Sequence, residues 1–198
     1  MDFDHDAGWV KVPDVLSEEQ VATVLSECGQ LLELPAELRL ARDRPHSGTR
    51  HLDELDTRVE IVRQLVNDRA LTELVTELLG ETYALDQTHY RCPQPGYGEQ
   101  SLHADGMTAH DPTENGFVTA IVALVDFTET NGATRLLPGS HLRPDLQQRS
   151  GTLASHPDEI RLTGPAGTAF VFGGGVLHAG AQNNATTERP ALQLIWRS

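Results

Sequence analysis

Two side chains that commonly bind transition metals, His103 and Asp105, stand two positions apart in the chain. In an extended segment the residues at i and i+2 point to the same face, so this imidazole and this carboxylate can reach one ion. The third ligand of a facial set must come from elsewhere. His178 is the best candidate, because an apolar strand pattern and the flexible glycines at 173–175 precede it and would place it at a strand end where the backbone bends. Such a set leaves the opposite positions of an iron(II) ion open for a co-substrate and oxygen. By itself, a His-x-Asp pair is more often a chance or surface pair than a ligand set.

Arg189 follows His178 by eleven residues. The turn-rich stretch 183–187 between them lets the next strand double back, which would bring the arginine to the same pocket. A guanidinium is a two-pronged donor for carboxylates, so a dicarboxylate that chelates the metal at one end could be held at the other. The alternative is a surface strand residue that pairs with Glu188 or another acid.

Capping residues and the spacing of apolar side chains predict helices in the first part of the chain. Ser17 and Gln20 form a capping box, and the apolar residues that follow recur at helical spacing, which predicts a helix over 17–34. Residues 35–57 show no period, so we expect a long loop, either a mobile lid or a poorly ordered segment. Two more helical stretches follow, at 58–66 and 69–79.

After residue 80 the sequence changes to short apolar runs separated by Pro, Gly and Asn, which is typical of strands. The runs are 82–92, 117–127, 133–137, 167–172 and 191–196. Helices followed by many short strands predict a mainly β fold, a double-stranded β-helix (jelly roll, cupin-like) buttressed on one face by the N-terminal helices. We expect one domain over 1–198, with a mainly helical layer over 1–80 and the jelly-roll core over 81–198.

Charge and hydropathy exclude several classes of partner. The chain has 29 acidic and 15 basic side chains and a formal charge of −14, which would repel the phosphate backbone of a nucleic acid. No apolar run approaches the roughly 20 residues of a membrane span, and the first residues lack the pattern of a signal peptide. Cys28 and Cys92 have no metal-like spacing, so we expect reduced core thiols. The sequence predicts a cytoplasmic protein without a nucleic-acid or membrane partner, and it leaves monomer and homodimer both open.

Three segments carry a family resemblance: GYGEQSLHADG (96–106), VALVDFTETNGATRLLPGSH (122–141) and GTAFVFGGGVLHAGAQNNATTERPAL (167–192). In this order they resemble the phytanoyl-CoA dioxygenase family, whose pattern is a His-x-Asp pair, a segment with Asn-Gly and Pro-Gly-Ser-His, and a distal His followed by an Arg. The opening residues 8–20 are similar as well, so the resemblance covers nearly the whole chain. It implies iron(II), 2-oxoglutarate as co-substrate and O2.

The resemblance also implies roles for single residues. His103, Asp105 and His178 match the iron ligands, and Arg189 matches the clamp on the far carboxylate of 2-oxoglutarate. A looser comparison within the family adds three residues to the co-substrate pocket: Thr119, Gln100 and His89.

Five further residues are candidates for contact with the organic substrate: Gln87, Tyr97, His110, Arg135 and Gln193. Gln87, His89 and Arg91 alternate along one strand and so share a face, and Gln193 shares the face of Arg189. Each candidate has a structural alternative. The two glutamines can be satisfied polar groups of the sheet, His110 a loop residue, and Arg135 a partner of Asp126 or Glu129. His51 lies in a polar stretch and is expected to be solvated.

These features predict an iron(II)- and 2-oxoglutarate-dependent oxygenase that hydroxylates a small molecule, such as an amino acid or a biosynthetic intermediate, with release of succinate and CO2. Related halogenases have Gly or Ala at the position of Asp105 to admit a halide, so the carboxylate here disfavours halogenation. Two alternatives stay open. One is a non-catalytic cupin-like barrel that binds a small ligand, and the other is a metal-dependent cupin oxygenase that does not use 2-oxoglutarate.

Overall fold

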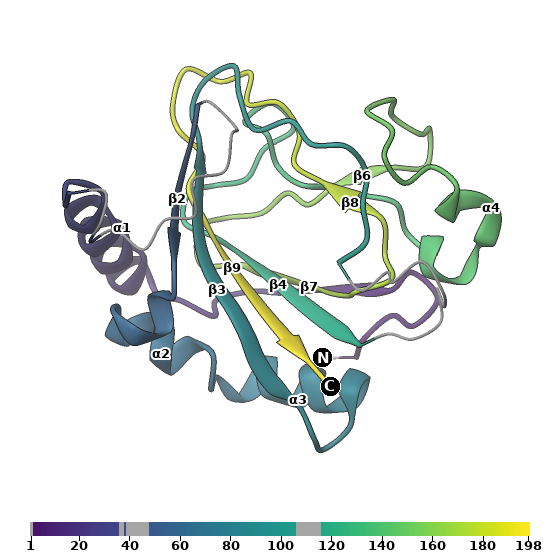
Figure 1. Ribbon diagram of the computed structural model, residues 1–198, viewed down its shortest axis with the longest axis horizontal. Coiled ribbons are helices and arrows are strands. Elements are labelled where there is room, and N and C mark those ends of the chain that lie inside the picture. The colour runs from purple at the N-terminus through teal and green to yellow at the C-terminus, as the bar shows by residue number, and fades with distance from the viewer. Residues whose placement is uncertain (1, 36–37, 39–47, 106–115) are drawn as a thin grey trace.

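The computed structural model describes the chain except for residues 1, 36–37, 39–47 and 106–115 (Figure 1). The helices are α1 (Glu18–Leu32), α2 (Glu60–Leu65), α3 (Arg69–Leu79) and α4 (Pro144–Gln147), with short 3-10 turns η2 (Leu55–Thr57) and η3 (Ser140–Leu142). The strands are β1 (Trp9–Val12), β2 (Thr49–Asp53), β3 (Ala84–Pro93), β4 (Phe117–Ala123), β5 (Arg135–Leu136), β6 (Ile160–Arg161), β7 (Ala169–Gly173), β8 (His178–Ala179) and β9 (Ala191–Arg197).

The strands form two antiparallel sheets that face each other. The larger has six strands in the order β1-β7-β4-β9-β3-β2, and the smaller has three in the order β6-β5-β8. Figure 1 shows α1, α2 and α3 along the outer side of the six-stranded sheet, away from β6 and β8. This arrangement confirms the predicted jelly roll with helices on one face.

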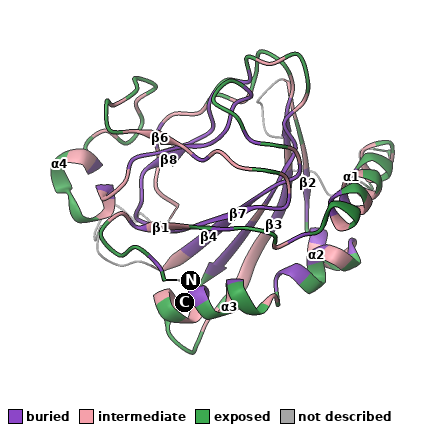
Figure 2. Ribbon diagram, turned by 180° about the vertical axis from the view of Figure 1, so that it is seen from behind, coloured by how far each residue is buried: buried purple, intermediate pink, exposed green. Residues whose placement is uncertain are grey.

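The six-stranded sheet packs on both sides because its side chains alternate. Apolar side chains of β4 and β9 face the helices and are buried with them: Val118, Ala120, Val122, Leu192, Leu194 and Trp196. They share one core with Val24 of α1 and Leu71 of α3. The alternate residues, among them Ile121 and Gln193, line the space between the sheets. Figure 2 shows the strands largely buried, while α1 and α3 turn exposed residues outward.

The helix signals in the sequence are confirmed. The Ser17 hydroxyl accepts a hydrogen bond from the amide of Gln20, and the Gln20 side chain accepts one from the Ser17 amide, which completes the capping box of α1. Asp68 caps α3 by accepting from the amides of Ala70 and Leu71. No described helix is both long enough and apolar enough to cross a lipid bilayer.

Two strands lie in the part of the chain that was expected to be helical or looped. β1 pairs with β7, and β2 pairs with β3 at the edge of the large sheet. The expectation of a loop throughout 35–57 is therefore wrong for 49–53. The pairing of β2 is long-range, and its sequence Thr-Arg-His-Leu-Asp lacks a clear apolar alternation. Eleven of the 23 residues of the predicted lid, 36–37 and 39–47, lie outside the described residues.

Candidate metal centre and co-substrate pocket

The two candidate histidine ligands are held together by backbone hydrogen bonds. His103 and His178 form an isolated antiparallel bridge and exchange both N–H···O bonds, each 2.9 Å long. The glycines at 173–175 carry the chain from β7 in the large sheet to β8 in the small one. His178 is therefore the first residue of a strand, whereas the sequence had placed it at the end of one. The bridge brings the two imidazole centroids to 4.5 Å.

Both imidazoles present the same nitrogen to the site. Nδ1–H of His103 donates to the carbonyl of Ser101 at 2.8 Å, and Nδ1–H of His178 donates to the carbonyl of Val176 at 3.0 Å. These bonds leave the Nε2 lone pairs for a metal. Burial, and secondly the neighbouring His178, lowers the pKa of His103, which favours the neutral form that binds metals.

Asp105 completes the group. Its Oδ1 lies 4.0 Å from Nε2 of His103, and its Oδ2 lies 3.5 Å from Nε2 of His178. Thr119 on β4 donates its hydroxyl to Oδ2 at 2.6 Å and so orients the carboxylate. One ligand atom from each of the three residues lies within 4.8 Å of the others. Two imidazoles and one carboxylate gathered in this way fit an iron(II) ion with open positions.

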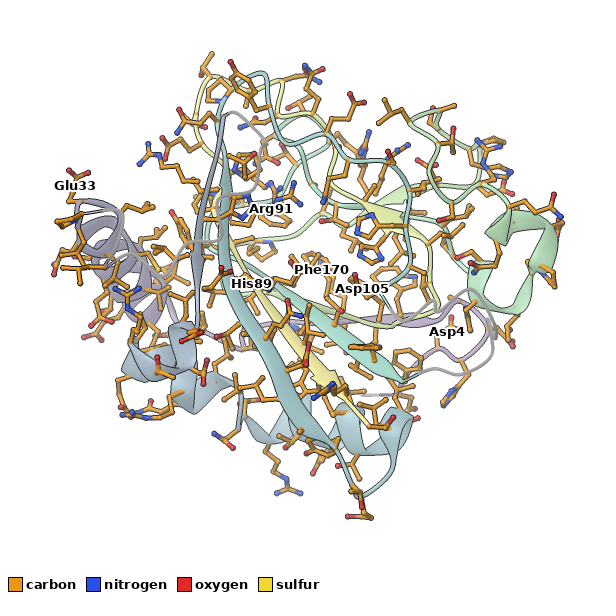
Figure 3. The ribbon with its side chains drawn as sticks, viewed as in Figure 1. Asp4, Glu33, His89, Arg91, Asp105 and Phe170 are labelled. Atoms are coloured by element: carbon orange, nitrogen blue, oxygen red, sulfur yellow. The ribbon has the colours of Figure 1, made fainter. Side chains whose placement is uncertain are left out.

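A cavity of about 250 Å³ opens beside this group between the two sheets. Its polar lining includes His51 of β2, Gln87, His89 and Arg91 of β3, Gln100 before the bridge, and Gln193 of β9. Its apolar lining includes Phe117, Ile121 and Ile195. Figure 3 shows His89 and Arg91 reaching from β3 into the same interior space as Asp105 and Phe170.

Arg189 lines this cavity from just before β9 and is 2% exposed. Its Nε has no hydrogen-bond partner among the described residues. The guanidinium lies over the ring of Phe127, 4.8 Å from the centroid. Burial, and secondly the charge of Arg91, lowers the pKa of Arg189 to about 9. The suggested pairing with Glu188 is absent, because that carboxylate is bound by Arg50 and Gln94. A buried cation of this kind is ready for an incoming anion.

Most of the residues predicted for the two pockets surround the cavity. Gln87, His89, Gln100 and Gln193 line it. Gln100 holds two elements together, since its Oε1 accepts from Arg91 and, at 3.0 Å, from the amide of Gly180. Thr119 supports the metal centre through Asp105 and is not among the lining residues, so the expectation that its hydroxyl faces the co-substrate is not supported.

Two predicted substrate contacts, Arg135 and Tyr97, are not among the residues that line the cavity. Arg135 is buried in an ion pair with Glu159 at 3.2 Å and donates to the carbonyl of Gln100, so it holds the small sheet in place and does not line the cavity. Its partner is neither of the two acids suggested from the sequence. Tyr97 is 46% exposed and its ring covers Gly48, which has a φ of +80°. His110 lies outside the described residues.

Two basic residues of the lining, Arg91 and His51, were not among the predicted sites. Arg91 shares the period-two pattern of Gln87 and His89, so the same alternation could have identified it. His51 was expected to be solvated and instead faces the cavity, because β2 pairs with β3 and sets His51 opposite Arg91. No local signal could have found it.

Comparison with known proteins finds relatives named as dioxygenases. The chain is 33% identical over 158 residues to dioxygenase trt7 of Aspergillus terreus, covering 73% of this chain and 52% of that protein, so it spans about half the relative's length. It is 28% identical over 229 residues to ectoine dioxygenase of Streptomyces avermitilis, covering 99% of this chain and 76% of the relative.

The fold is shared with a solved structure. The crystal structure of EctD from S. alaskensis with 2-oxoglutarate and 5-hydroxyectoine superposes with a TM-score of 0.76 at 22% identity, covering 98% of this chain and 73% of that one. The phytanoyl-CoA dioxygenase (PhyH) family matches residues 5–191, nearly the whole chain. The resemblance predicted from the sequence is therefore confirmed, and the chain belongs to the phytanoyl-CoA dioxygenase family.

Proposed function

We propose that this protein is an iron(II)- and 2-oxoglutarate-dependent oxygenase that hydroxylates a small molecule and releases succinate and CO2. The observation that carries the proposal is the buried guanidinium of Arg189, which faces the same cavity as the group of His103, Asp105 and His178. A dicarboxylate that binds the metal at its 2-oxo acid end would reach this cation with its other carboxylate.

The chain's own residues would position and shield the reactants. Bound iron would supply the oxygen-activating redox chemistry. Arg189 would fix the far carboxylate of 2-oxoglutarate, and Asp105 would fill the position that a halide needs, which favours oxygenation. Phe172 packs against His178 with ring centroids 4.5 Å apart, which keeps water from one side of the metal centre.

A small substrate suits the volume of the cavity, about 250 Å³, which is at the low end for ligand sites. Ectoine, the compound in one relative's name, is a free small molecule. The charge of −14 argues against a nucleic-acid partner. We further propose that the protein acts in the cytoplasm on a free metabolite.

The test is anaerobic titration of the protein with iron(II) and 2-oxoglutarate. A weak visible charge-transfer band is expected for the wild type, with succinate formed once air and substrate are admitted. Arg189→Ala should lose the band and 2-oxoglutarate binding and keep its iron content, whereas the exposed Arg63→Ala should behave as the wild type. Iron binding without any 2-oxoglutarate band in the wild type would point to an oxygenase that does not use this co-substrate. Absence of iron binding would point to a non-catalytic barrel.

A further inference from the structure

A chain of hydrogen bonds crosses the cavity wall formed by β2 and β3. Oδ1 of Asp53 lies 2.5 Å from Nδ1 of His89, and Nε2 of His89 lies 2.6 Å from Oε1 of Gln87. Nε2 of Gln87 in turn donates to Asp86 at 2.8 Å. His89 and Asp53 are both buried, and their side chains are only 8% and 12% exposed.

This chain fixes the charge of His89. Its Nδ1 faces a carboxylate, which accepts hydrogen bonds, and its Nε2 faces an amide oxygen, which also accepts. The amide cannot be reversed, since a flip would set Oε1 of Gln87 against the carboxylate of Asp86. Both ring nitrogens must therefore carry a proton, and His89 is an imidazolium paired with Asp53.

The neighbours of His89 in the cavity lining add no second carboxylate to the one of Asp53. On the same face stand His51 of β2, Arg91 of β3 and Gln193 of β9, none of which is an acid. Among the described residues that line the cavity, Asp105 of the metal centre is the only acidic side chain.

His89 also lies across the sheet from the metal centre. It is paired with Gln193 of β9, which is paired with Ile121 of β4. Thr119, two residues earlier on β4, holds Asp105. Two strand spacings separate β3 from β4, about 10 Å in all. A small molecule can span this gap with one end at the metal and the other at His89.

We infer that the organic substrate is a carboxylate, and that His89, charged by Asp53, binds its acidic group on the β3 wall. The inference rests on the proposed function and adds a substrate class to it. Oε1 of Gln87 occupies the acceptor position at Nε2–H in the absence of substrate. An incoming carboxylate oxygen displaces this neutral acceptor, because a hydrogen bond between two charged groups is about twice as strong as one to a neutral partner.

The charge on His89 is tested first by histidine-selective ¹⁵N NMR of the protein, with the His89 signals assigned by their loss in His89→Gln. At pH 8, above the ordinary histidine pKa of about 6.5, both nitrogens of His89 should be protonated in the wild type. Asp53→Asn should return the ring to the neutral form. A neutral His89 in the wild type overturns the inference, and this holds even if a variant fails to fold.

The substrate class is tested by succinate release with pairs of small amino and carboxylic acids and their primary amides. The acid of an active pair should exceed its amide by about 10- to 100-fold in kcat/KM. His89→Gln should lose this preference and keep its 2-oxoglutarate affinity. The matched control is His5→Gln, which breaks a surface pair with Glu77 and should keep the preference.

Two results contradict the inference alone. The first is equal kcat/KM for amides and acids in the wild type. The second is weaker 2-oxoglutarate binding by His89→Gln, which would place His89 in the co-substrate pocket. A wild type that binds no 2-oxoglutarate overturns the proposed function instead.

Discussion

The substitution Arg189→Met is expected to stabilise the metal-free protein while abolishing co-substrate binding. The guanidinium is 2% exposed and has no carboxylate partner among the residues described. Its pKa falls from the ordinary arginine value to about 9, mainly through burial. A fall of this size corresponds to roughly 5 kcal/mol of unfavourable burial of the charged form. Methionine has similar reach and no charge.

Two effects reduce the expected gain. The cation–π contact of Arg189 with Phe127 stabilises the charged side chain in the folded protein by about 0.5 to 2 kcal/mol. The cavity also admits water, which lowers the desolvation penalty further. We therefore expect Arg189→Met to raise the free energy of unfolding by about 1 to 3 kcal/mol, or the Tm by roughly 2 to 10 °C. This is the exchange of stability for function expected at a binding site.

The assay is urea unfolding of the metal-free proteins, followed by thermal unfolding with Ni(II) and 2-oxoglutarate. At 100 times its Kd, 2-oxoglutarate should stabilise the wild type by about 2.7 kcal/mol and leave Arg189→Met unchanged. The control Arg63→Met removes an exposed arginine and should alter stability by less than about 0.5 kcal/mol. A less stable metal-free Arg189→Met, or one that still responds to 2-oxoglutarate, would refute the reasoning.

Four further outcomes are expected. Thr119→Val removes the hydrogen bond to Asp105 and should weaken metal affinity about 10- to 100-fold in a chelator competition titration; unchanged affinity would show that the hydroxyl does not orient the ligand. Burial raises the pKa of Cys28 to about 12 and that of Cys92 to about 11, so neither thiol should react with iodoacetamide at pH 8 until the protein unfolds. Because both thiol pKa values are higher in the folded protein than in the unfolded chain, the two neutral thiols contribute fully to the free energy of unfolding below pH 9. This contribution should be lost as the pH rises towards 11 for Cys92 and 12 for Cys28. Urea unfolding at a series of pH values would measure the loss. Ser17→Ala removes the cap of α1 and should cost about 1 kcal/mol, and a loss below 0.3 kcal/mol would argue against the capping box.

Elements with local signals were predictable from the sequence. The cap residues Ser17 and Asp68 set the starts of α1 and α3 within a residue of the expected positions. The apolar runs between turn residues became β3, β4, β7 and β9 because their side chains alternate between two buried layers. Spacing together with a family pattern identified His103, Asp105 and His178 as candidate metal ligands, and the structure gathers these three side chains into one group.

Features that depend on pairing between distant segments were not predictable. β2 is a strand only because β3 offers it an edge, and that pairing places His51 in the cavity lining and Asp53 against His89. The ion pair of Arg135 with Glu159 joins two segments that share no sequence pattern. The period-two alternation of apolar residues predicts which face of a strand a side chain occupies. It does not predict which other strand pairs with it.

The backbone bridge between His103 and His178 brings the two candidate iron ligands together through main-chain hydrogen bonds, in which neither imidazole takes part. Small zinc domains reach their fold only when metal binds, and they lose it to chelators. In this protein the contact that joins the two ligand positions belongs to the sheet and not to the coordination sphere of an ion. We therefore expect a chelator to remove iron without unfolding the protein, and added iron(II) to bind again without a cycle of refolding.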